Sequence, residues 1–155
     1  MTKDTIFALS SGSGRAGLSV FRISGSMALQ VLQTLTGITK PEARYAYRVV
    51  LKNNIDKETI DDGIAIFFPN PKSFTGEDVL EFHLHGSIAV IREVTEVLSG
   101  FIGVRIANAG EFTKRAFDNR KLDLTMVEGL ADLVNAETKE QKRQAQKQIK
   151  DLIRK

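Results

Sequence analysis

Three side chains of metal-binding types alternate with apolar residues along residues 79–85. Glu81, His83 and His85 occupy every second position there, and such alternation predicts a half-buried strand with all three on one face. Two imidazoles and a carboxylate are the donors of a non-haem iron(II) or a zinc site. However, neighbours on one strand face project in parallel about 6.5 Å apart. A metal-dependent enzyme therefore remains an alternative, no metal ligand is assigned, and His83 is expected on a solvated face.

Two basic residues are candidate ligand contacts. Arg22 lies in residues 18–23, an otherwise apolar stretch that predicts a strand, where a guanidinium is costly unless it reaches water or an anionic partner. That partner is either Glu81 or an anionic ligand. Lys121 lies in a polar stretch, residues 119–123, whose composition alone is typical of a solvated linker.

Residues 12–17 match the pattern GxGxxG, which occurs in dinucleotide-binding folds. That use requires a helix to begin inside the motif so that its N–H groups can hold the pyrophosphate. Here the next segment, residues 18–23, predicts a strand, so the motif indicates a glycine turn between two strands that can approach a ligand closely. The sequence also lacks the GxxxxGK[ST] pattern of a P-loop, so no nucleotide hydrolysis of that kind is expected from it.

The composition is that of a globular protein. The chain has 155 residues, of which 42% are hydrophobic and 26% are charged, so we expect one domain with an appended element. The absence of cysteine excludes disulfides and thiol catalysis. No apolar run approaches the ~20 residues that span a bilayer, and the expected location is the cytoplasm, without membrane association.

Charge is unevenly distributed along the chain. The chain has 22 basic and 19 acidic residues. Residues 138–155 contain seven of the basic and two of the acidic ones, so the rest of the chain contains 15 basic and 17 acidic residues. The body is therefore slightly acidic and the end strongly basic. A tRNA-binding adaptor that uses this basic end is the second alternative.

Apolar periodicity predicts an α+β fold with a mixed sheet of about five strands and flanking helices. A helix capped by Ser24 or Ser26 should end at Gly37, and another should run from Ser87 to Gly100. A last, long helix should begin near Thr125 and open a helical domain. The other expected elements are strands at 5–9, 18–23, 45–51, 63–68, 79–85 and 104–107, and a helix at 111–119.

Several motifs, taken in order, resemble the amino-terminal domain of tRNA-modification GTPases of the TrmE/MnmE type. The resemblance covers nearly the whole chain up to about residue 138. Its motifs are DTIFA at 4–8, RISG at 22–25, SFTGEDVLE at 73–81, HG at 85–86, GEFTKRAF at 110–117 and KLDL at 121–124.

This resemblance implies a domain related to the tetrahydrofolate-binding fold of the glycine-cleavage T-protein. Residues 1–120 would then bind a reduced folate such as 5-formyltetrahydrofolate and form a homodimer, and residues 121–155 would begin the helical domain. Carried over by position, the folate contacts are Arg22, Glu81 and Lys121, and no catalytic residue is assigned.

The resemblance also implies partners for the full-length protein. Such a protein would hydrolyse GTP with magnesium and potassium, and would join a flavin-dependent partner protein to place an aminomethyl-type group on the wobble uridine of certain tRNAs. Because the GTPase domain is not expected in this chain, the chain by itself is expected to be inactive as a GTPase.

Overall fold

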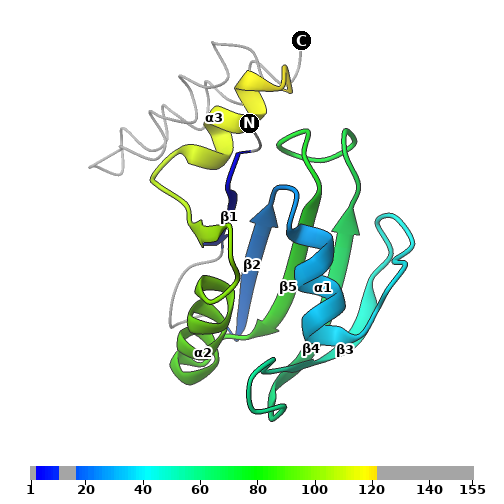
Figure 1. Ribbon diagram of the computed structural model, residues 1–155, viewed down its shortest axis with the longest axis vertical. Helices are drawn as coiled ribbons and strands as arrows, with labels where there is room; N and C mark the ends of the chain where they lie inside the picture. Colours follow the sequence, from blue (N-terminus) through cyan, green and yellow to red (C-terminus); the bar gives the residue numbers. More distant parts are fainter. Residues whose placement is uncertain (1–2, 11–16, 122–155) are drawn as a thin grey trace. The chain divides into compact units, whose positions relative to one another are not determined.

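The computed structural model describes residues 3–10 and 17–121, which form two compact units (Figure 1). Among the described residues, the first unit consists of those up to Ser73 and of Glu77–Ala107, and the second of Phe74–Gly76 and those from Asn108 to Lys121. The expected helix from Thr125 and the basic segment 138–155 lie outside the described residues.

The first unit holds a six-stranded sheet and two helices. Its elements are β1 (Thr5–Leu9), β2 (Leu18–Ser24), α1 (Ala28–Thr36), β3 (Tyr47–Lys52), β4 (Thr59–Phe68), β5 (Val79–His85), α2 (Ile88–Ser99) and β6 (Val104–Ile106). The strand order is β3-β4-β5-β2-β1-β6. All neighbours are antiparallel except β1 and β6, which are parallel. The expected mixed α+β sheet is thus confirmed, with six strands rather than about five.

The core lies on one face of this sheet. Burial alternates along the central strands, so that Phe21 on β2 and Phe82 on β5 are buried while their neighbours Arg22 and Glu81 are partly exposed. Both α1 and α2 contribute buried residues to the cluster that contains the two phenylalanines, and both lie on the same side of the sheet in Figure 1. The alternation therefore leaves Arg22 and Glu81 on the opposite face.

The start of α1 differs from the sequence expectation. Neither Ser24 nor Ser26 caps this helix, whose N-cap is Met27 without a side-chain cap. Instead, the Met27 N–H donates to the Thr5 hydroxyl of β1 at 2.9 Å, and the Ser24 hydroxyl donates to a Glu77 carboxylate oxygen at 2.7 Å. The expected ends of the helices at Gly37 and Gly100, and the Ser87 cap of α2, are confirmed.

Gly25, between β2 and α1, is a position where only glycine fits. Its φ is 139°, and a Cβ there would lie 2.5 Å from the Thr5 hydroxyl oxygen and 2.7 Å from the Thr5 Cα. Because the Cα of a buried strand cannot move aside, both the backbone conformation and the space exclude a side chain.

We expect Gly25→Ala to destabilise the first unit by about 1–3 kcal/mol, the usual cost of a strained backbone conformation. Urea unfolding of the two proteins measures the difference. Gly17→Ala is the control, since nothing lies within 4 Å of a Cβ there. Equal losses for the two variants would contradict the assigned role of Gly25.

The second unit contains α3 (Glu111–Asp118), which begins at the left-handed residue Gly110. Arg115 is buried on this helix and lies 3.5 Å from a Glu111 carboxylate oxygen one turn earlier. After the helix, the Asn119 side-chain amide donates to the Thr75 carbonyl at 2.8 Å. This hydrogen bond joins two parts of the unit that are distant in sequence.

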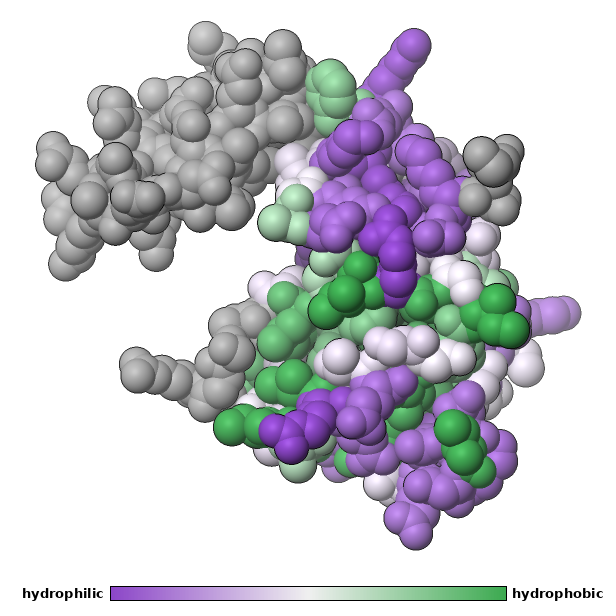
Figure 2. Space-filling model, turned by 60° about the vertical axis from the view of Figure 1, so that its left-hand side comes forward, coloured by the Kyte–Doolittle hydropathy of each residue, from purple (hydrophilic) through white to green (hydrophobic). Residues whose placement is uncertain are grey.

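Apolar side chains also reach the surface of the described residues. Figure 2 shows hydrophobic residues exposed on the face that it presents. The most exposed large ones are Ile55, Ile88 and Ile102. Among the described residues, no helix has both the length and the apolar character needed to cross a membrane.

Candidate ligand-binding site

Arg22 and Glu81 face each other across two neighbouring strands. They are direct partners in the register of β2 and β5, on the face opposite α1 and α2. Arg22 Nε donates to Glu81 Oε2 at 3.1 Å, and Arg22 Nη2 lies 3.0 Å from the same oxygen. The sequence left open whether Arg22 pairs with Glu81 or with a ligand, and the structure shows the pair.

The second oxygen of Glu81 is held by His83. His83 Nε2 lies 3.0 Å from Glu81 Oε1, and since a carboxylate oxygen only accepts, Nε2 carries the hydrogen. The Glu81 side chain is 14% exposed and that of Arg22 is 30% exposed. The carboxylate is therefore fixed from both sides but still reaches solvent, and Oε1, which has one partner where Oε2 has two, keeps a lone pair that can accept a ligand N–H.

Lys121 lies in the second unit. Its main-chain N–H donates to the Ala116 carbonyl at 2.7 Å, and its Cε lies 3.6 Å from the place that a Cβ of Gly76 would occupy. The structure thus joins Arg22 with Glu81 in the first unit and sets Lys121 in the second. Nothing in the described contacts links Lys121 to that pair.

His85 pairs with an aspartate of β4. Asp61, in the first part of β4, accepts from the His85 main-chain N–H at 2.8 Å and from Nδ1 at 2.8 and 3.0 Å. In the described part of the chain, the possible metal ligands that lie close together are Asp61, Asp62 and His85. Glu81, His83 and His85 do not form such a group. The latter trio is therefore wrong as a metal site: Glu81 and His83 bond each other, and His85 bonds Asp61.

Gly63 allows β4 to pass close to β5 beside these residues. A Cβ on Gly63 would lie 2.2 Å from the His83 carbonyl oxygen, so no other residue permits this approach. The strand expected at 63–68 begins earlier in the structure, at Thr59, and so includes Asp61 and Asp62. In the sequence, two aspartates directly before Gly63 were the feature that could have indicated an irregular first part of β4.

Hydrogen bonding to Asp61 raises the pKa of His85 above its ordinary value, and the charge of Asp61 adds to this effect. We expect Asp61→Asn to lower the pKa of His85 in the metal-free chain, measured by NMR titration of its ring protons. Because the pKa of His85 is higher in the folded chain than in the unfolded chain, protonation of His85 stabilises the fold. This stabilisation is complete at pH values below the pKa of the unfolded chain, and it is lost as the pH rises through the pKa of the folded chain. An unchanged His85 titration in Asp61→Asn would contradict the assignment.

Comparison with known proteins agrees with the motifs. A family model described as the N-terminus of the GTP-binding protein TrmE matches residues 5–121. The chain is 53% identical over 142 residues to the tRNA modification GTPase MnmE of Roseobacter denitrificans, which covers 92% of the chain and 33% of that protein. It is 52% identical over 145 residues to the protein of the same name from Rickettsia rickettsii, covering 94% of the chain and 33% of that protein.

A third relative gives the same result. The tRNA modification GTPase MnmE of Brucella anthropi is 54% identical over 144 residues, covering 92% of the chain and 32% of that protein. The chain thus spans about a third of the length of the curated relatives that it matches. On the extent of the family match and these identities, the chain belongs to the family of the N-terminus of the GTP-binding protein TrmE.

Proposed function

We propose that the Arg22–Glu81 pair is the centre of a binding site for a reduced folate with a one-carbon group, such as 5-formyltetrahydrofolate. The observation that carries the proposal is the Glu81 carboxylate, which is largely buried but reaches solvent between Arg22 and His83. A pterin ring presents an N–H and an amino group side by side, and a carboxylate is a suitable acceptor for such a pair. Oε1 of Glu81 has the free lone pair, and Oε2 would accept as well once it gives up one of its two Arg22 contacts.

The three candidate contacts have different roles in this proposal. Glu81 accepts from the pterin, and Arg22 holds Glu81 through its Nε and Nη2 atoms. Positive charge from Arg22, and from Lys121 of the second unit, suits the formyl oxygen or the carboxylates of the glutamate tail. The assignment of Lys121 rests on the family resemblance.

The wider role is proposed from the relatives, which carry the name tRNA modification GTPase. Residues 1–120 would bind the folate and form a homodimer, and residues 121–155 would begin a helical domain. In a longer protein, GTP with magnesium and potassium, a flavin-dependent partner protein and tRNA would complete the system. Such a protein acts in the cytoplasm.

Calorimetric titration of the chain with 5-formyltetrahydrofolate tests the binding proposal, and light scattering tests the homodimer. The proposal expects saturable binding at one site per chain and a mass near twice the 17.2 kDa of one chain. A well-folded chain that shows no binding at millimolar folate would contradict the first part. A monomer at high protein concentration would contradict the second.

A further inference from the structure

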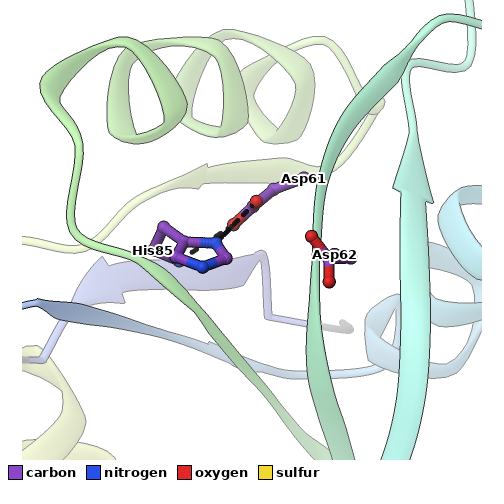
Figure 3. Close-up of side chains that lie close together, drawn as sticks. All are labelled: Asp61, Asp62 and His85. Atoms are coloured by element: carbon purple, nitrogen blue, oxygen red, sulfur yellow. Dashed lines mark hydrogen bonds and ion pairs between the residues drawn. The ribbon is translucent and has the colours of Figure 1, made fainter.

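The first part of β4 and the end of β5 bring three possible metal ligands together (Figure 3). One ring nitrogen of His85 and one carboxylate oxygen each of Asp61 and Asp62 lie within 4.8 Å of one another. Asp61 and His85 point toward each other and are joined by hydrogen bonds, while Asp62 approaches from the neighbouring position of β4. The group is separate from the Arg22–Glu81 pair.

Asp61 determines which ring nitrogen of His85 is able to bind an ion. Its oxygens only accept, so the Nδ1 atom that they contact must carry a hydrogen, and in the neutral ring the lone pair is then on Nε2. This carboxylate–imidazole arrangement is the one in which histidine ligands are commonly held in metal sites. Asp61 itself is well enclosed, with a side chain 10% exposed, whereas that of His85 is 64% exposed.

Two potential ligand groups beside Asp61 have no protein partner. Within the described part of the chain, neither His85 Nε2 nor the Asp62 carboxylate makes a hydrogen bond or an ion pair, whereas Nδ1 is fully engaged with Asp61. Both belong to exposed residues, so that their side chains can turn toward a common ion.

A cavity provides room for a hydrated ion. It has a volume of about 380 Å³, and its walls include Asp62, His83, His85 and Arg48. Asp62 and Arg48 in the cavity wall carry one charge of each sign, and Asp61, which bonds His85 but is not part of the wall, adds a further negative charge that favours a cation. Mixed imidazole and carboxylate donors favour zinc or another late first-row divalent ion over calcium or magnesium.

We propose that His85 Nε2 and the Asp62 carboxylate bind a divalent transition-metal ion such as Zn²⁺, and that Asp61 is the positioning residue that orients the imidazole. Water completes the coordination, because the two protein ligands leave positions open. None of the three residues contacts Arg22 or Glu81 in the described structure, and His83, which lines the cavity, is the residue that bonds Glu81.

The chain suits a direct test, because it contains two histidines and no cysteine. An untagged, chelator-treated chain is titrated with Zn²⁺ by calorimetry, and the two imidazoles are followed by NMR. The proposal expects the His85 ring signals to respond to Zn²⁺ before those of His83. His85→Gln and Asp62→Asn should each weaken Zn²⁺ binding at least about tenfold, since even the loss of an outer partner of a ligand commonly costs that much. The control Glu42→Gln, at an exposed carboxylate outside the group, should leave Zn²⁺ binding unchanged.

Asp61→Asn separates positioning from folding. Asparagine retains an oxygen that can accept from Nδ1, so Asp61→Asn should weaken Zn²⁺ binding less than Asp61→Ala, which removes the outer partner and should cost about 10- to 100-fold. Thermal unfolding in the presence of chelator shows whether each variant folds. Three results would overturn the proposal: no Zn²⁺ binding by the folded wild-type chain at millimolar ion, undiminished binding in folded His85→Gln, or a first response at His83.

Discussion

Replacing Glu81 by alanine is expected to weaken binding of 5-formyltetrahydrofolate roughly ten- to a hundredfold. The variant removes a charged acceptor that is 14% exposed, and loss of a hydrogen bond to a charged group costs about 1.5–3 kcal/mol. It also releases Arg22 and His83 from the oxygens that hold them. Calorimetric titration of the variant beside the wild-type chain measures the effect.

Two further variants make this result specific. Glu81→Gln keeps one acceptor oxygen of similar shape and should lie between the wild type and the alanine variant. Glu58→Ala removes a carboxylate from the exposed turn before β4 and should bind like the wild type. If folded Glu81→Ala binds the folate with wild-type affinity, Glu81 does not contact the ligand.

The largest loss of stability is expected from Phe82→Ala. Phe82 is 0% exposed on the central strand β5, directly opposite Phe21 on β2 and Ala65 on β4. Truncation of a buried phenylalanine costs about 3–5 kcal/mol, because apolar burial is lost and a cavity remains. Since domains are stable by only about 5–15 kcal/mol, much of the total would disappear.

Urea unfolding measures this loss of stability as a lower midpoint concentration of urea, provided that the dependence of the unfolding free energy on urea concentration stays the same. Ile55→Ala is the control, because Ile55 is 87% exposed and exposed substitutions usually change stability by less than about 0.5 kcal/mol. A Phe82→Ala variant that unfolds at the same urea concentration as Ile55→Ala would show that the core is not arranged around β5.

Much of the first unit was predictable from local patterns. The alternation along residues 79–85 predicted both the bounds of β5 and its core face, because the side-chain period of a strand is two residues. The end of α1 was predictable from Gly37 and the start of α2 from Ser87, because helix capping depends on residues close in sequence. The expected identities of these elements are confirmed.

The remaining features depend on contacts between residues that are distant in sequence. Thr5 receives the Met27 N–H across 22 positions, so the serines near α1 were misleading as caps. Asp61 bonds His85 across 24 positions, a contact set by the register of β4 against β5. A single sequence shows which residues share a strand face, but not which strands are neighbours.

The same limit applies to the candidate site. Arg22 and Glu81 were assigned from a family resemblance, and the antiparallel register of β2 and β5 places them together. The role of His83 as a partner of Glu81 was not predicted. Its contact follows from a side-chain rotation along one strand face, which spacing alone does not determine.

NMR mapping can show whether Arg22 and Glu81 form the folate site. The isotopically labelled chain is titrated with 5-formyltetrahydrofolate, and changes in amide and side-chain signals are assigned to residues. We expect the largest changes at Arg22 and Glu81, with a response at Lys121. Changes confined to other parts of the chain, or none at saturating folate, would contradict this assignment.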